Sequence, residues 1–208
     1  RERRIRHPLV NIGLLRKPAF LYACLGAMAL GLALFGSTYL IPLFVQTALG
    51  FTATEAGLLM LPAGIVLGMV FPLAGRLADK QSARKLVIFG IAVFALSAAL
   101  FALSDLDLAF GWLALWAVLG RIGIGFMLPA LSTGALNPLE AQELGAGSST
   151  LNFMRQLGGA FGVNLVALTI EFGEHSAGMP TINAFHWAWW LVAVFVAVAA
   201  VPVWRMRG

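Results

Sequence analysis

The chain has 208 residues, of which 60% are hydrophobic and only 11% are charged, and its mean hydropathy is +0.89. A soluble domain carries roughly 25% charged residues, so this composition excludes an ordinary soluble protein. The formal net charge of +5 would suit a nucleic-acid ligand, but the basic residues are confined to particular segments, and we expect no nucleic-acid partner.

Six long apolar segments follow one another along the chain. Each is long enough to cross a hydrocarbon core of about 30 Å as a helix, whereas the strands of a membrane barrel would be shorter and would alternate in polarity. The predicted fold class is therefore an all-α integral membrane bundle of six transmembrane helices. We expect a basic cytoplasmic or interfacial linker over 1–18 and a helical domain over 19–205, with spans at about 20–46, 56–76, 86–104, 110–136, 147–170 and 184–204.

The connections between the predicted spans differ in charge. Lys and Arg gather before the first span, between the second and third spans and after the sixth, whereas 47–55, 105–109 and 171–183 contain acids but no base. The positive-inside rule then places both termini in the cytoplasm. Tryptophans at the predicted span ends indicate interfacial belts: Trp112 and Trp116, then Trp187, Trp189 and Trp190, at the outer ends and Trp204 at the inner end.

Polar side chains distinguish the spans by the surroundings that we expect for them. The third and sixth spans are almost wholly apolar, which predicts an outer wall facing lipid. The first, fourth and fifth spans carry polar groups, which in hydrocarbon face a bundle interior or a wet cavity. The candidate residues for a substrate cavity are Ser37, Tyr39, Gln46, Arg121, Asn152 and Gln156. The place of the apolar spans, third and sixth, suggests two units of three helices each.

Arg121 is the one charged residue deep within a predicted span. It follows Phe110 by eleven residues, which places it about 16 Å along the helix at a rise of ~1.5 Å per residue. An arginine at a helix centre costs about 2.5–3.5 kcal/mol on insertion scales. We expect it to face a hydrated cavity, held by helix carbonyls, by polar groups of the first span such as Ser37 or Tyr39, or by a carboxylate outside this chain. A static bond to a backbone carbonyl is the alternative.

Two basic segments suggest roles in conformational change. The connection 75–85, GRLADKQSARK, places one acid among four bases, and Gly75, Arg76, Asp79, Lys80 and Arg84 are predicted to form an electrostatic latch; an ordinary positive-inside loop is the alternative. On the fifth span, Arg155 is about 12 Å from the predicted start by the helical rise. We expect it to stabilise an inner gate or an inter-domain contact rather than to bind substrate.

Glycine pairs spaced four residues apart occur on two predicted spans. They are Gly64 with Gly68 and Gly158 with Gly162, and such spacing is typical of helices that pack closely in membranes. No His, Cys or acidic residues have metal-ligand spacing, and no deep acid, His pair or nucleophile–base pair is present. We therefore expect no metal, no cofactor and no enzyme activity.

The 75–85 connection resembles the loop motif of the major facilitator superfamily, Gly-x-x-x-Asp-(Arg/Lys)-x-Gly-(Arg/Lys)-(Arg/Lys). Gly75, Asp79, Lys80 and Arg84 fit this motif. Ser82 replaces its second glycine and Ala83 replaces a base, which leaves the tight turn at 82 open and is typical of the second half of such transporters. The segments FGSTYLIPLFVQTALGFTATEAGLLMLPAG (35–64), GRIGIGFMLPA (120–130) and GSSTLNFMRQLGGAFGV (147–163) resemble the fourteen-spanner drug:proton antiporter family of the EmrB/QacA type.

The resemblance implies a C-terminal six-helix half with 3+3 inverted repeats, whose partner is an N-terminal half outside this chain. It implies a secondary active multidrug efflux transporter of the bacterial inner membrane, exporting lipophilic or cationic drugs by alternating access in exchange for protons. The implied partners are the lipid bilayer, a drug-like small molecule and a periplasmic adaptor protein. No acid lies deep in these spans, so the titrating group of a proton-coupled protein would lie outside this chain. The alternatives are a non-transporting membrane subunit and an exporter of another small solute.

Overall fold

The computed structural model describes residues 13–205, and it confirms the all-helical membrane fold class. Most of the predicted linker 1–18, with four of its basic residues, lies outside the described part.

The first span comprises α1 (Pro18–Gly31), a π-helical turn (η3, Leu32–Gly36) and α2 (Ser37–Thr47), after a short 3₁₀ turn (η2, Leu14–Arg16). The next three spans are α3 (Ala53–Lys80), α4 (Ala83–Ala102) and α5 (Phe110–Leu136). The fifth is α6 (Leu144–Glu171) with a second π-helical turn (η4, Phe172–Ser176), and the sixth is α7 (Thr181–Val198) with α8 (Ala200–Trp204).

Local chemistry explains several of the helix ends. At the start of α3, Thr52 and Glu55 form a capping box in which the Glu55 carboxylate accepts from the Thr52 backbone N–H at 2.8 Å. Gly50 precedes this cap with φ +74°, a conformation that favours glycine. Between α7 and α8 the helix is interrupted at Ala199, because Pro202 has no N–H to donate to the carbonyl of Val198.

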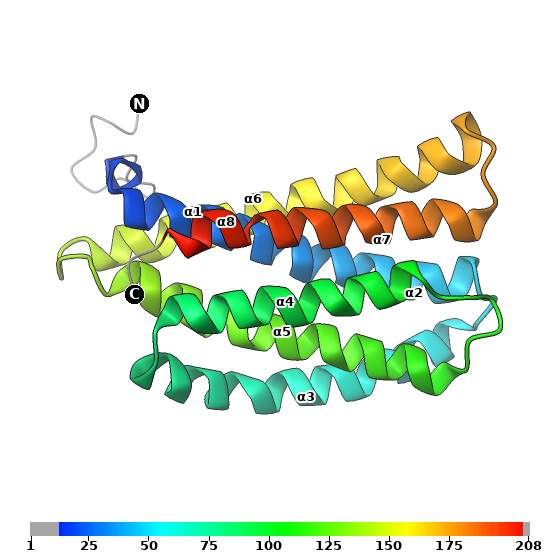
Figure 1. Cartoon of the computed structure of the whole chain (residues 1–208), viewed down its shortest axis with the longest axis horizontal. Helices are drawn as coiled ribbons and strands as arrows, with labels where there is room; N and C mark the ends of the chain where they lie inside the picture. The colour runs from blue at the N-terminus through cyan, green and yellow to red at the C-terminus, as the bar shows by residue number, and fades with distance from the viewer. Residues whose placement is uncertain (1–12, 206–208) are drawn as a thin grey trace.

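Figure 1 shows the six spans running side by side along the long axis, with the start of α1 and the end of α8 at the same end of the bundle. We call this the basic end, because its exposed or half-buried side chains include Arg16, Lys17, Arg76, Lys80, Arg84, Lys85 and Arg205. The opposite end, here the acidic end, carries Glu55, Asp105, Asp107, Glu171 and Glu174 and, among the described residues, no Lys or Arg. The charge asymmetry of the sequence is therefore an asymmetry of the folded bundle.

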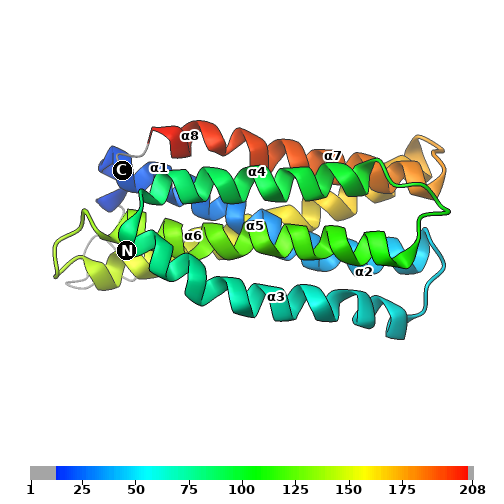
Figure 2. The same ribbon diagram turned by 60° about the horizontal axis from the view of Figure 1, so that its bottom comes forward.

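Helix packing interlaces the two sequence halves. α5 packs along α3 and α4, α1 packs along α6, and α4 also packs along α7. α5, the first span of the second unit, therefore lies against the second and third spans of the first unit. α1, the first span of the first unit, packs most closely against α6, the second span of the second unit. This exchange is what a pseudo-two-fold relation between inverted repeats produces. α3 lies at an edge of the bundle in both views (Figures 1 and 2).

An aromatic cluster holds the spans together toward the acidic end. Phe101 stacks on Trp189 with ring centroids 4.5 Å apart, and Phe44 lies against Phe185 at 5.5 Å. Such pairs contribute about 0.5–1.5 kcal/mol each beyond their burial. The prediction of an interfacial Trp189 is wrong, since this residue is 1% exposed. Its neighbours Trp187 and Trp190 on the same span remain on the outside.

An ion pair joins the start of α1 to the turn before α6. Lys17 Nζ lies 2.6 Å from Glu143 Oε2, and Glu143 also accepts a hydrogen bond from the backbone N–H of Glu140 at 3.1 Å. The hydrogen bond from Lys17, followed by that from Glu140, lowers the pKa of the Glu143 carboxyl. Because the folded pKa is depressed, the stabilising contribution is present above the ordinary pKa of about 4.3 and is lost as the pH falls through the lower folded value.

We therefore expect the turn before α6 to open reversibly in acid. Amide hydrogen exchange of residues 140–147, normalised to intrinsic rates, should be slower at about pH 6 than at about pH 3. In Glu143→Gln this difference should disappear, because the titrating carboxyl is gone. The same pH difference in wild type and Glu143→Gln would show that another group is responsible.

Candidate functional site

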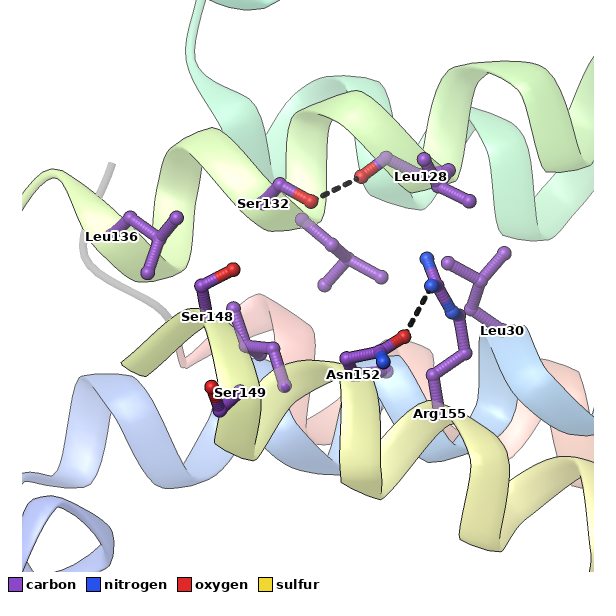
Figure 3. Close-up of a pocket in the computed structure, with 11 residues that line it drawn as sticks. Leu30, Leu128, Ser132, Leu136, Ser148, Ser149, Asn152 and Arg155 are labelled. Atoms are coloured by element: carbon purple, nitrogen blue, oxygen red, sulfur yellow. Dashed lines mark hydrogen bonds between the residues drawn. The ribbon is translucent and has the colours of Figure 1, made fainter. Parts of the chain in front are cut away.

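Polar side chains of α5 and α6 meet beside α1 at a pocket of about 330 Å³ near the basic end (Figure 3). We call this the polar pocket. Its polar lining is Ser132 from α5 and Ser148, Ser149, Asn152 and Arg155 from α6, and its apolar wall includes Leu30 and Leu128. The first, fourth and fifth spans thus enclose a common space. Of the six candidate cavity residues, only Asn152 lines this pocket.

Arg155 occupies the deeper part of the polar pocket. Its Nη2 donates to Asn152 Oδ1 at 2.6 Å, and Figure 3 shows the guanidinium pointing from α6 toward Leu30 and Leu128. α6 begins at Leu144 rather than at the predicted 147, so Arg155 is about 16 Å from the helix start instead of about 12 Å. No carboxylate within residues 13–205 pairs with it. The pocket therefore contains a cation whose described partner is a single neutral amide.

Arg121 lies within the bundle at 5% exposure. Its Nη2 donates to Thr38 Oγ1 at 2.9 Å, and Thr38 in turn donates to the carbonyl of Leu34 at 2.6 Å. The partner is on the first span, as predicted, but it is neither Ser37 nor Tyr39. Within residues 13–205 the arginine is bonded to a side-chain hydroxyl rather than to a backbone carbonyl or a carboxylate.

The neighbouring first-span candidates point elsewhere. Ser37 is 3% exposed and its hydroxyl donates to the carbonyl of Ala33 at 2.5 Å, whereas Tyr39 is 39% exposed. Consecutive helical residues differ by about 100° in direction, so only Thr38 faces Arg121. Gln46 and Gln156 are exposed, and the amide of Gln46 donates to its own helix at Pro42. The predicted cavity residues are therefore distributed along the bundle rather than gathered at one point.

The predicted latch is mostly helical. Gly75, Arg76, Asp79 and Lys80 lie on the last turns of α3, which continues four residues beyond the predicted 76. Asp79 is exposed and makes no ion pair with a described residue. The proposed pairing of Asp79 with a base is thus absent from this conformation. The Ser82 backbone has φ −59°, accessible to any residue, so its replacement of glycine costs no strain.

Arg84 of the latch has a partner that the sequence did not suggest. Its Nη1 donates to the carbonyl oxygen of Trp204 at 3.4 Å, and its guanidinium lies 5.8 Å from the centroid of the Trp204 ring. This cation–π contact joins the start of α4 to the end of α8. One of the four bases of the 75–85 connection is therefore in contact with the sixth span.

The least buried spans are the second and fifth, not the third and sixth. In the most apolar part of each span, 22% of α3 and 28% of α6 is buried inside the bundle. The corresponding buried share is 50% for α4 and 39% for the sixth span. Beyond its basic first turn, the exposed side chains of α4 are apolar as predicted, Phe89 and Leu96 among them. Polarity alone did not indicate which spans present the widest surface, because exposed side chains are largely apolar on α3 but include polar groups such as Gln156 and Asn164 on α6.

The two glycine pairs behave differently. A Cβ at Gly158 would overlap the Met28 carbonyl, and one at Gly162 would lie 2.8 Å from Leu32 Cγ, so this pair brings α6 against the first span. The close-packing interpretation is confirmed there. A methyl group added at Gly64 or Gly68 would meet no other described part of the chain within 4 Å, so close packing of that pair is not found within residues 13–205.

These features define a multi-pass helical membrane protein in which polar groups and one buried arginine lie between the first, fourth and fifth spans. Within residues 13–205 no group of three His, Cys, Asp or Glu residues is placed to hold a metal ion. Binding and movement of a solute require no more than such polar groups in a hydrated path.

A family model described as Major Facilitator Superfamily matches residues 1–163, and the chain belongs to this superfamily. It is 31% identical over 184 residues to the lincomycin resistance protein LmrB of Listeria innocua, covering 87% of this chain and 38% of that protein. It is 31% identical over 184 residues to the multidrug export protein EmrB of Escherichia coli, covering 86% of this chain and 36% of that protein. These relatives confirm the resemblance to drug-efflux proteins, and the superfamily confirms a transporter fold rather than an enzyme.

The fold is also similar to a solved structure. A bacterial homologue of the human drug peptide transporters PepT1 and PepT2 superposes with a TM-score of 0.80 at 16% identity, covering 92% of this chain and 42% of that chain. At this identity the similarity shows the fold alone. The chain spans about two fifths of the length of the curated relatives named above.

Proposed function

We propose that this chain is the C-terminal half of a secondary active multidrug efflux transporter of the bacterial inner membrane. Its relatives named for lincomycin resistance and multidrug export support a drug substrate. The observation that carries the proposal is the buried Arg121, bonded across the bundle to Thr38 of the first span. A charge in mid-membrane with one neutral partner is expensive, and a role in solute movement accounts for its presence.

The proposed mechanism is alternating access. The described half would rock against an N-terminal half, with the polar pocket opening at the basic end, which we place in the cytoplasm by the positive-inside rule. No described Asp or Glu lies deep in a span. Proton exchange would therefore depend on a carboxyl group in the other half. We propose a periplasmic adaptor as a further partner on the strength of the likeness to EmrB.

The test is drug transport by the full-length protein in inside-out membrane vesicles. We expect accumulation of a lipophilic cation when a proton gradient is imposed, and its collapse when an ionophore removes the gradient. Accumulation of peptides or sugars without any drug transport would favour an exporter of another solute. No transport of any solute by well-folded protein would favour a non-transporting subunit.

Asp79→Asn should lower drug transport at equal expression. Asp79 is exposed at the end of α3 beside Arg76 and Lys80. The proposed latch requires a second conformation in which Asp79 pairs with a base, and loss of the carboxylate would shift the balance between the two. The measurement is initial transport rate in vesicles with quantified protein. Glu140→Gln, another exposed acid at the basic end, is the control and should transport as wild type. Normal transport by Asp79→Asn would contradict the proposed role of Asp79 in a latch.

Cysteine at position 155 should be labelled from the cytoplasmic side in one conformation only. The side chain lines the polar pocket at the basic end, so its access to water depends on whether that end is open. Labelling by a membrane-impermeant thiol reagent is compared with and without drug, after Cys24 is replaced by Ala. A Ser149→Cys variant, nearer the pocket mouth, is the labelled control. Equal labelling of position 155 in both conditions contradicts a gating role.

A further inference from the structure

A second, wholly apolar groove runs along the outside of the bundle. It has a volume of about 490 Å³ and lies between α1, α6 and the sixth span. The residues that matter here are Leu25 and Ala29 of α1, Phe161 and Leu165 of α6, and Val198 and Pro202 of the sixth span. Every lining residue is apolar, glycine or proline. We call it the lipid-facing groove, and it is separate from the polar pocket on the other side of α1 and α6.

The groove follows from how three spans pack. α1 forms its floor because Gly158 of α6 lies directly on the backbone of Met28. Toward the acidic end the fifth and sixth spans are in contact, since a Cβ at Gly173 would lie 2.9 Å from Ala184 Cβ. Toward the basic end α8 lies instead on α1, where a Cβ at Gly26 would lie 3.1 Å from Val203 Cγ2. The groove is thus open toward the basic end.

The walls of the groove are open on the outside of the described bundle. Leu25 is 41% exposed, Phe161 is 54% exposed and Val198 is 61% exposed. A groove with no hydrogen-bonding side chain, at the depth of the hydrocarbon core, offers nothing to water. Such a groove suits an apolar acyl chain.

The mouth of the groove carries unpaired positive charge. Arg205 comes directly after α8 and three residues after Pro202, which lines the groove. The Arg205 side chain has no hydrogen-bond or ion-pair partner within residues 13–205. Trp204, 66% exposed, marks the interface at this level.

We propose that the lipid-facing groove binds one acyl chain of an anionic phospholipid, whose headgroup phosphate is held by Arg205. Basic residues at a gap between transmembrane helices select anionic headgroups, and the apolar groove selects the chain. This site depends on the membrane location of the bundle and not on drug transport.

The test is native mass spectrometry of the full-length protein with phosphatidylglycerol or phosphatidylcholine of identical acyl chains. Wild type should retain phosphatidylglycerol about fivefold better, the effect expected of one basic residue at an anionic headgroup. Arg205→Gln should lose this preference but still bind both lipids, while Lys85→Gln, a cation on α4 away from the groove, should keep it. Equal retention of both lipids by wild type, or an unchanged preference in Arg205→Gln, would overturn the proposal.

The acyl-chain part is tested by filling the groove. Ala29→Phe fills its floor and should remove the retained lipid of either type, whereas Ala92→Phe, on the exposed face of α4, should not. Val198→Trp fills the groove from its exposed wall and gives an independent result if Ala29→Phe folds poorly. Lipid retained by Val198→Trp at the wild-type level contradicts a bound chain in this groove.

Discussion

Arg121→Ala is expected to lower the rate of drug transport by about ten- to hundredfold while the protein still inserts and folds. A hydrogen bond to a charged group contributes about 1.5–3 kcal/mol, and Ala removes the bond that this guanidinium makes to Thr38 at 2.9 Å. Insertion should not suffer, because the buried charge is itself unfavourable in the membrane. Arg121→Lys keeps the charge but loses the planar fork, so we expect it to be impaired as well.

The partner position provides matched controls for this result. Thr38→Val removes the hydroxyl with little change in shape and should reduce transport, whereas Thr38→Ser should retain most of it. Ser37→Ala removes a neighbouring hydroxyl that bonds its own helix and should transport nearly as wild type. Initial rates in vesicles, normalised to folded protein, separate these cases. Full transport by Arg121→Ala would leave the arginine without a functional role.

Gly158→Ala should destabilise the folded bundle strongly. A single added methyl would overlap the Met28 carbonyl and lie 2.6 Å from the Met28 Cα, and backbone atoms cannot turn aside as a flexible side chain can. Overpacking typically costs about 1–3 kcal/mol, which we expect to lower the unfolding midpoint of the full-length protein by a few degrees. The measurement is thermal unfolding in detergent, followed by loss of the monodisperse peak.

Gly145→Ala on the same helix is the control. Its Cβ would have nothing within 4 Å, and Ala exceeds Gly in helix propensity by about 0.8–1.0 kcal/mol, so the midpoint should stay or rise. Equal midpoints for the two variants would show that α6 can move away from α1 without cost.

The sequence predicted the spans well because length and hydropathy determine them. The fourth span is Phe110–Leu136, as predicted, and residues 13–205 contain six spans. Hydropathy places the end of a helix too early where the helix emerges from the membrane. The second span was predicted to end at 76, but α3 continues to Lys80, because charged residues are tolerated in a helix once water solvates them.

Side-chain direction was harder to predict. Thr38 was missed in favour of Ser37 and Tyr39, because a polarity count ignores the ~100° that separates neighbours on a helix. Trp189 was placed at the interface by residue type, although only tertiary packing decides which of three nearby tryptophans turns inward. Gly64 and Gly158 have the same local spacing, and only the presence or absence of a facing helix distinguishes them.

The interlaced packing of the spans has a consequence for biosynthesis. α1 enters the membrane before the other described spans, yet its closest partner, α6, is made only after the intervening spans have left the ribosome. Through that interval the Met28 backbone and Thr38 are exposed to lipid or to other proteins, and Arg121 enters the membrane as a charge whose final surroundings are incomplete. Individually stable helices can wait for one another in a bilayer, and the time they wait is set by translation. Cellular quality control should therefore act on this protein mainly before the fifth span inserts, because α1 first acquires its closest partner at that step.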